Sequence, residues 1–282
     1  MNPIVAAIQM TSGMDLQANL DMAQGLLAQA AKAGAKLAVL PEMFPLLGVG
    51  EEFKKAKAAI QEEPGNGPIQ SFLSEQAKAN HMWIVGGTIP LSSEHPQKSY
   101  AATLVFDEQG KQVARYDKLH LFDATLSTSE AYQESAAMMH GNHITVIDTP
   151  VGRAGIAVCY DLRFPELFRA MFSLGAQIFI VPAAFTVPTG KAHWDILLKA
   201  IAVQNFSYVV ASGEVGTHGG GRQTYGNSVI FNPNGEELAR LVDGIGVVTA
   251  TIDLDYLHDQ RRKIMIESHQ RIFMDCGNIT IK

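Results

Sequence analysis

Short aliphatic runs alternate with longer segments of helical character along the whole chain. Three of these runs, "LAVL" (residues 37–40), "GIAVC" (155–159) and "IFIVPAAF" (178–185), are apolar at almost every position. Short continuous apolar runs are typical of strands buried on both faces. The Ala-rich segment 20–35 predicts a helix, with Gly34 as the stop signal near its end. The alternation predicts an α/β fold in which helices cover buried sheets.

The two halves of the chain resemble each other. "GAKLAVLPEMF" (residues 34–44) aligns with "GAQIFIVPAAF" (175–185), and "YAATLVFDEQGKQVARY" from Tyr100 aligns with "YGNSVIFNPNGEELARL", 125 residues later. The same offset pairs "NHMWIVGG" with "NFSYVVAS", and "FDEQG" and "FNPNG" indicate the same hairpin turn. This repeat predicts two sheets packed face to face with helices outside. We therefore expect one pseudo-twofold domain over residues 1–275, followed by a tail over 276–282.

Residues able to do chemistry lie at the ends of three predicted strands: Glu42, Lys118 and Cys159. Glu42 comes directly after "LAVLP", at the edge where sites gather in α/β sheets. Lys118 lies in the alternating segment "VARYDKLHLFD", which places Lys118 and His120 on one strand face. Each also has a plainer interpretation, Glu42 as a loop carboxylate and Lys118 as an edge residue with its amine in water.

Cys159 is the last residue of the run "GIAVC" and is followed by the turn "YDLRFPE". A helix is expected to begin there, because Pro165 is favourable in the first turn of a helix. A free cysteine is often simply buried. At a helix N-terminus, however, the positive end of the dipole lowers a thiol pKa. A carboxylate, an ammonium and a thiol together provide the base, the oxyanion stabiliser and the nucleophile of acyl transfer. This combination favours Cys159 as a nucleophile.

These segments resemble a known family. "LPE", "YDKLHLFD" and "GIAVCYDLRFPE" are similar to the three catalytic motifs of the carbon–nitrogen hydrolase, or nitrilase, superfamily, in its Nit-type amidase branch. The similarity runs from about residue 4 to residue 273 and implies a four-layer αββα sandwich. Two positions depart from the pattern: Asp117 stands where a basic residue is common, and Gln204 where a Glu is usual.

The resemblance implies a role for each residue of the catalytic motifs. Cys159 attacks the amide carbonyl and forms a thioester, with Glu42 as general base. Lys118 and the Tyr160 backbone N–H hold the oxyanion. Glu134, in "AYQES", matches an additional glutamate that orients Lys118 or the second-step water; a surface loop acid is the alternative.

Three further residues, Arg163, Phe185 and Thr189, lie in segments that resemble the family's substrate pocket. Arg163 either binds a substrate carboxylate bidentately or forms an ion pair at the helix start with Asp161 or Glu166. If it is structural, Lys191 or Arg222 is the next candidate for the carboxylate.

The implied activity is cysteine-dependent hydrolysis of a small carboxylate-bearing amide with ammonia release. Deaminated glutathione or a 2-oxo acid ω-amide is the expected substrate, and no metal or cofactor is expected. The alternatives are an N-carbamoyl amino acid hydrolase or a nitrilase of the same superfamily, and, more distantly, a non-enzymatic interaction module. The family resemblance also implies a homodimer or a higher homo-oligomer.

Composition and motif content argue against several other classes of protein. The 282 residues carry a net charge of −6 with Lys and Arg scattered, which argues against a nucleic-acid surface. No apolar run approaches the ~18 residues of a membrane span, and two distant cysteines fit a reducing cytoplasm. H-E-x-x-H, paired C-x-x-C and G-x-S-x-G motifs are absent, so zinc and serine hydrolases are disfavoured. A Cys–His hydrolase using His120 or His193 is the nearest rival, and the Gly-rich segment 216–224 predicts a mobile loop near the site.

Overall fold

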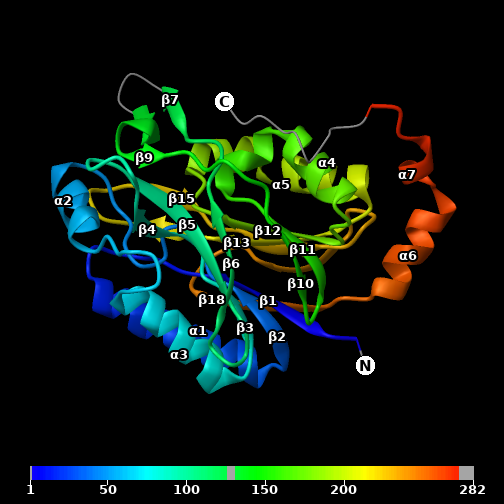
Figure 1. Ribbon diagram of the computed structural model, residues 1–282, viewed down its shortest axis with the longest axis horizontal. Helices are drawn as coiled ribbons and strands as arrows, with labels where there is room; N and C mark the ends of the chain where they lie inside the picture. The colour runs from blue at the N-terminus through cyan, green and yellow to red at the C-terminus, as the bar shows by residue number, and fades with distance from the viewer. Residues whose placement is uncertain (1, 126–130, 273–282) are drawn as a thin grey trace.

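Two β-sheets pack face to face between outer layers of helices (Figure 1). The computed structural model describes residues 2–125 and 131–272. The predicted four-layer αββα sandwich is confirmed. The predicted boundary between residues 275 and 276 lies outside the described residues.

The first sheet has eight strands in the described part of the chain, in the order β18-β1-β2-β3-β5-β4, with β6 and β9 also paired to β5. Its central strands β1, β2 and β3 are parallel, and β5 and β6 continue antiparallel. The bounds are β1 Ile4–Gln9, β2 Ala35–Val39, β3 Trp83–Val85, β4 Ile89–Ser92, β5 Ser99–Phe106, β6 Gln112–Asp117, β9 Met138–Met139 and β18 Gly246–Thr251.

The second sheet repeats this arrangement. Its order is β10-β11-β12-β13-β16-β17, with β11, β12 and β13 parallel and β16 and β17 antiparallel. The predicted internal repeat is therefore confirmed at the level of topology. The bounds are β10 Val146–Thr149, β11 Gly152–Ile156, β12 Ile178–Ala183, β13 Tyr208–Gly213, β16 Ser228–Phe231 and β17 Glu237–Leu241.

The two equivalent hairpins turn in the same way. After β5, the Asp107 carboxylate accepts the backbone N–H groups two and four residues further on. After β16, the Asn232 side-chain oxygen does the same. Gly110 and Gly235 close the turns at φ values of 79° and 74°, which glycine adopts without a Cβ clash. The sequence match "FDEQG" to "FNPNG" thus reflects one turn geometry.

Helices cover the outer face of each sheet. α1 and α3 lie against the first sheet and α4 and α5 against the second, while α2 lies at one end of the molecule and α6 and α7 at the other (Figure 1). One buried cluster joins residues of both sheets with α4 and α5, and another lies under α1 and α3. The bounds are α1 Leu16–Lys32, α2 Glu51–Ala59, α3 Pro68–Asn80, α4 Pro165–Ser173, α5 Val187–Asn205, α6 Leu254–Lys263 and α7 Ile266–His269.

The first helix starts earlier than the sequence pattern predicted. It begins at Leu16, where Asp15 caps it by accepting the Ala18 N–H, and it ends at Lys32. Gly34 then takes a left-handed conformation at φ 85°, as expected of a stop signal.

Short elements complete the end of the molecule near α2. They are β7 Asp123–Thr125, β8 Ala131–Gln133, the 3₁₀ helix η1 Glu134–Ala136, the 3₁₀ helix η2 Cys159–Arg163, β14 Val215–Thr217 and β15 Gln223–Tyr225. β14 and β15 pair as a hairpin, so the Gly-rich segment predicted to be a mobile loop is largely the end of that hairpin. Its His218 is buried and bonded to the Ser12 carbonyl and to Thr224.

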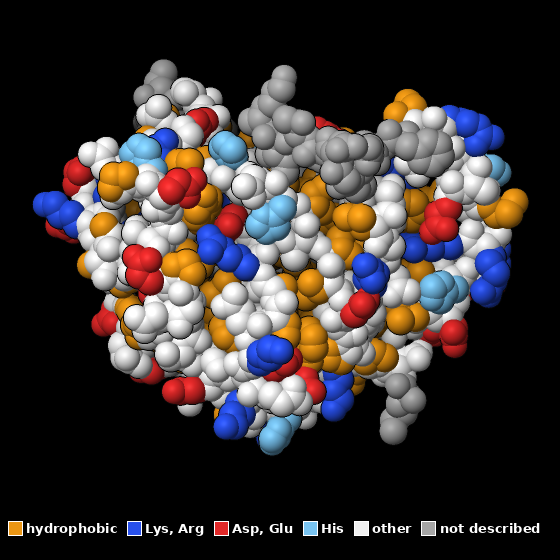
Figure 2. Space-filling model, viewed as in Figure 1, with side chains coloured by type: hydrophobic (Ala, Val, Ile, Leu, Met, Phe, Trp, Pro, Cys, Tyr) orange, Lys and Arg blue, Asp and Glu red, His pale blue; other side chains and the backbone are white. Residues whose placement is uncertain are grey.

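The surface mixes both signs of charge. Figure 2 shows Lys and Arg side chains distributed over one face, several of them near α6, with acidic side chains among them. No helix in the described ranges combines the length and the apolar character needed to span a bilayer.

Candidate active site

A cavity of about 450 Å³ lies where the three predicted strand ends meet, with α2 forming one wall. It brings together the eight residues to which the family resemblance gave a catalytic or substrate-binding role. Those lining residues are Glu42, Lys118, Glu134, Cys159, Tyr160, Arg163, Phe185 and Thr189.

Glu42 follows β2 and is held from both halves of the repeat. One carboxylate oxygen accepts the Lys118 ammonium at 2.8 Å, and the other accepts the backbone N–H of Ala184 at 2.9 Å. Ala184 directly follows β12, the counterpart of β2 in the second half. Burial raises the pKa of Glu42, but the Lys118 charge and hydrogen bond outweigh it and the pKa is lowered overall. Glu42 is therefore a buried, ionised carboxylate, the form that a general base requires.

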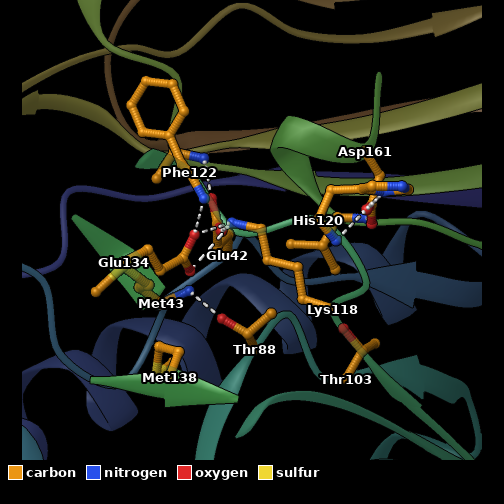
Figure 3. Close-up of polar contacts among 12 residues, drawn as sticks. Glu42, Met43, Thr88, Thr103, Lys118, His120, Phe122, Glu134, Met138 and Asp161 are labelled. Atoms are coloured by element: carbon orange, nitrogen blue, oxygen red, sulfur yellow. Dashed lines mark hydrogen bonds and ion pairs between the residues drawn. The ribbon is translucent and has the colours of Figure 1, made fainter. Parts of the chain in front are cut away.

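Lys118 lies just beyond the end of β6 and bridges two carboxylates. Its Nζ is 2.8 Å from Glu42 Oε1 and 2.9 Å from Glu134 Oε2 (Figure 3). Burial lowers its pKa, but the charges of Glu134 and Glu42 raise it well above the ordinary value. Lys118 therefore stays cationic at any physiological pH.

The expectation that Lys118 and His120 share a strand face is wrong. β6 ends at Asp117, so the period-two alternation stops before Lys118. Lys118 points toward Glu42, whereas His120 Nδ1 lies 2.7 Å from Asp161 Oδ1, away from that cluster (Figure 3). His120 is not among the cavity-lining residues, which disfavours it as a base.

Glu134 begins η1 and points inward to Lys118. Its Oε2 also accepts the backbone N–H of Phe122 at 2.7 Å. Its side chain is 19% exposed, so the alternative of a surface loop acid does not describe it. The contact fits the predicted role of orienting the Lys118 ammonium.

Cys159 sits on a strained turn between β11 and α4. Its φ of 49° is left-handed, a conformation that a residue with a Cβ rarely adopts and that clusters at functional sites. The turn is closed by Asp161, whose N–H donates to the Val158 carbonyl at 3.0 Å and whose Oδ2 accepts the Val158 N–H at 2.7 Å. This geometry directs the thiol into the cavity.

The predicted lowering of the thiol pKa is wrong. Burial and the nearby Glu42 carboxylate raise the pKa of Cys159 well above its usual value, and Lys118 opposes this only in part. The full helix α4 begins at Pro165, six residues beyond the sulfur, so its dipole is remote. The resting group is a thiol hydrogen-bonded to Glu42.

The substrate-pocket candidates form the rest of the wall. Arg163 Nη2 lies 3.1 Å from His193 Nδ1, and its guanidinium carbon lies 5.9 Å from the Tyr160 ring centre. In the described ranges Arg163 forms no ion pair, so the alternative that it pairs with Asp161 or Glu166 is wrong.

Thr189, another pocket candidate, is hydrogen-bonded to Thr186 at the start of α5. Phe185 packs against Trp194, with ring centres 5.0 Å apart. The Tyr160 backbone N–H as an oxyanion donor stays a prediction.

Sequence reasoning missed two residues of this region. Lys57 on α2 lines the cavity, yet "EEFKKAK" looks like an ordinary solvated helix face. Asp161 is fully buried and bonded to Tyr116, His120 and Val158, although its place within "CYDLRFPE" gave a hint. Of the two reserve candidates, Arg222 lines the cavity, whereas Lys191 is exposed and does not.

Metal ligands do not gather in this region. Among the described residues, no group of three or more His, Cys, Asp or Glu side chains is arranged to hold a metal ion. The chemistry available from these side chains is nucleophilic attack by sulfur with proton transfer to a carboxylate.

Comparisons with known proteins identify the family of this chain. The family model described as carbon-nitrogen hydrolase matches residues 4–262. A Yersinia enterocolitica protein named deaminated glutathione amidase is 37% identical over 272 residues, covering 96% of this chain and 93% of that protein.

Solved structures are similar over nearly the whole chain. The C. elegans NitFhit protein superposes with a TM-score of 0.85 at 32% identity, covering 96% of this chain and 66% of that longer one. Saccharomyces cerevisiae Nit3, described as a member of branch 10 of the nitrilase superfamily, gives a TM-score of 0.84 at 30% identity, covering 96% and 97%.

Proposed function

Because this chain belongs to the carbon-nitrogen hydrolase family, we propose that it is an amidase in which Cys159 is the nucleophile and Glu42 the general base. The observation that carries the proposal is the position of the Lys118 ammonium between the buried Glu42 carboxylate and the partly buried Glu134 carboxylate. One cation there keeps Glu42 ionised beside the thiol and leaves a positive charge for a developing oxyanion.

In the first half-reaction, the Cys159 sulfur attacks the amide carbonyl carbon while its proton passes to Glu42. The C=O electrons move to oxygen, and the resulting oxyanion faces Lys118 and the Tyr160 backbone N–H. Glu42 then protonates the amide nitrogen, the C–N bond breaks and the amine leaves. The acyl group remains on sulfur as a thioester. An amide nitrogen leaves only when it is protonated, so the step needs a general acid. Glu42, which has just accepted the thiol proton, serves as that acid.

In the second half-reaction, Glu42 removes a proton from water and the hydroxyl attacks the thioester carbonyl. Collapse of the second tetrahedral intermediate expels the sulfur, which recovers its proton from Glu42. Glu134 holds Lys118 through both steps. No redox change occurs, and the sum is addition of one water across one C–N bond.

The substrate we propose is deaminated glutathione or a 2-oxo acid ω-amide. Support comes from the relatives' names and from Arg163, which lines the cavity without a carboxylate partner among the described residues. From a primary ω-amide the nitrogen leaves as ammonia, whereas from deaminated glutathione it leaves as the amino group of cysteinylglycine. N-carbamoyl amino acids and nitriles are the alternatives within the superfamily.

Three variants test the mechanism, with the release of the carboxylic acid as the readout. Cys159→Ala and Glu42→Gln should each abolish turnover, because one removes the nucleophile and the other the proton carrier. His120→Asn should cost far less, since His120 lies outside the cavity lining. If the histidine change is the lethal one, the base is His120 and the proposed mechanism fails.

We also infer that the enzyme works in the cytoplasm as a homodimer or a higher homo-oligomer. In support, Cys159 is a free cysteine, and α5 exposes Ile196 and Val203, at 67% and 41% of their surfaces. Sedimentation of the purified chain tests the assembly, and a monomer at micromolar concentration would refute it.

A further inference from the structure

Lys57 is a cationic side chain in the cavity wall that the mechanism does not use. It lies on α2, four residues after Phe53, so both occupy one face of the helix, and both line the cavity. No carboxylate of the described residues lies within ion-pair distance of its amine. Its hydrogen-bond partner is the thioether sulfur of Met138, at 3.1 Å. A sulfur atom is a weak acceptor and leaves the ammonium charge uncompensated.

The cavity as a whole is cationic. Five positively charged side chains and two carboxylates of the described residues line it, although the chain carries a net charge of −6. One of the five, Lys54, is paired with Glu51 outside the lining. Both carboxylates, Glu42 and Glu134, are engaged by Lys118. Arg222 has a buried Nε with no hydrogen-bond partner in this structure. Uncompensated cations facing a cavity favour an anionic ligand.

α2 forms the solvent side of this cavity, since each of its residues keeps some exposed surface, although Lys57 is partly buried in the cavity wall. In the proposed reaction the acyl group stays on Cys159 while the amine departs first, so the amine part of the substrate occupies the solvent side. Arg163, four residues after the sulfur, is assigned to the acyl-side carboxylate. Lys57 is therefore available to the other part of the substrate.

We infer that Lys57 binds a second carboxylate, carried on the amine side of the scissile amide, so that the preferred substrates are dicarboxylates. The inference rests on the proposed amidase function. It separates the two substrate classes left open above, because deaminated glutathione carries a carboxylate on each side of its amide and a 2-oxo acid ω-amide carries only one.

The charge of Lys57 also gives this contact a pH signature. Burial lowers the pKa of Lys57 to about 8, and Glu134 only partly offsets it. The other charges that face it are Lys118, Glu42 and Arg222. Above about pH 8 the free enzyme loses the ammonium, and with it the attraction for a second carboxylate.

The test compares deaminated glutathione with its C-terminal amide, which lacks one carboxylate and is otherwise the same. Release of the 2-oxo dicarboxylic acid measures both. Lys57→Met should lower kcat/KM for the dicarboxylate by about 10- to 100-fold, mainly through KM, because a hydrogen bond to a charged group is lost. The same substitution should change kcat/KM for the C-terminal amide by no more than about twofold, and this retained activity also shows that the variant is folded. Lys55→Met, an exposed neighbour that does not line the cavity, is the matched control.

The second experiment measures kcat/KM for both substrates as a function of pH and takes their ratio. Ionisations of catalytic groups affect both substrates equally and therefore cancel in this ratio. In the wild type this ratio should fall above about pH 8, and in Lys57→Arg it should stay level because the guanidinium remains charged. An equal loss for both substrates in Lys57→Met, or no loss for either, would overturn the assignment. If the wild type hydrolyses neither substrate, the proposed function fails and this inference fails with it, whereas Cys159→Ala should lose both substrates alike.

Discussion

The Asp161 carboxylate accepts a 2.7 Å hydrogen bond from the Tyr116 hydroxyl, across 45 residues of sequence. It also accepts the backbone N–H groups of His120 and Val158. Tyr116 and His120 flank Lys118, and Val158 precedes Cys159. One fully buried carboxylate therefore fixes the spacing between the proposed oxyanion stabiliser and the proposed nucleophile.

Replacing Asp161 should disturb that spacing. Asp161→Asn loses the charge that several donors share, and we expect a fall in unfolding free energy of about 1–3 kcal/mol in urea titrations. A displacement of about 1 Å at the reacting atoms costs about 100-fold in rate, so kcat should fall by about that factor with KM little changed. Tyr116→Phe removes only one donor and is the milder control. A loss of stability with kcat intact would show that Asp161 is only structural.

The internal repeat and the reactive residues could be predicted from the sequence, because both depend on local sequence pattern. Asp107 and Asn232 stabilise the same turn through their own side chains, so the two turns have similar sequences and the repeat can be recognised from them. Glu42 and Cys159 follow buried strands, where polar residues stand out.

Features of the site that depend on residues distant in sequence could not be predicted. The direction of the Cys159 pKa shift is set by burial and by Glu42, which is remote in sequence. Lys57 lies on a helix with no fully buried residue, and only the folded chain shows that one face of that helix closes a cavity.

Lys118→Met should reduce both rate and stability. Losing one oxyanion contact typically costs about 10²- to 10³-fold in kcat, and a change confined to KM would instead mark Lys118 as a ground-state binding residue. The substitution also leaves the buried Glu42 and the partly buried Glu134 without their cation. Breaking a buried ion pair in this way costs about 3–5 kcal/mol. Steady-state kinetics and urea unfolding measure the two effects.

A second substitution separates these effects. Adding Glu134→Gln to Lys118→Met removes one of the two unpaired charges, so part of the lost stability should return. Activity should not return, because the oxyanion contact is still missing. Recovery of both together would mean that the rate loss came only from misfolding.

Glu214 predicts an unusual pH dependence of stability. It is fully buried, and its two oxygens accept the Ser12 hydroxyl at 2.7 Å and the Ser12 N–H at 2.9 Å. Burial raises its pKa from 4.5 to about 8. Between these values the unfolded chain ionises Glu214 while the folded chain keeps the proton, so the unfolded state binds fewer protons. The stability contribution of Glu214 is therefore complete below pH 4.5 and is lost as the pH rises toward 8, at about 1.4 kcal/mol per pH unit.

Glu214→Gln tests this sign, because its amide does not titrate. The difference in unfolding free energy between wild type and variant should move by about 2–3 kcal/mol in favour of the variant between pH 5.5 and pH 7.5. Urea titrations at the two pH values measure it. A constant difference would mean that Glu214 is ionised in the folded protein throughout this range.

Arg163 is the residue we expect to recognise the acyl-side carboxylate. Arg163→Lys keeps the charge but loses the planar fork, so KM for a carboxylate-bearing amide should rise even though the net charge is unchanged. Arg163→Ala should raise KM further, and it should also abolish the preference of the enzyme for the acid over its acyl-side ester. Because Arg163 contacts His193, His193→Ala is the control for a change in the position of the guanidinium without loss of its charge.

A double comparison decides whether the contact is direct. If the Arg163 guanidinium binds the carboxylate, removing both the guanidinium and the carboxylate should cost less than the two separate losses added together, since either change alone already breaks the contact. Kinetics of wild type and Arg163→Ala on the acid and on its acyl-side ester supply the four values of kcat/KM. Simple additivity would place Arg163 among the structural residues of the cavity wall. The acyl-side carboxylate would then belong to Arg222, whose guanidinium lines the same cavity and donates to the Ala184 carbonyl at 3.2 Å. Arg222→Met would in that case show the non-additive pattern that Arg163→Ala lacked.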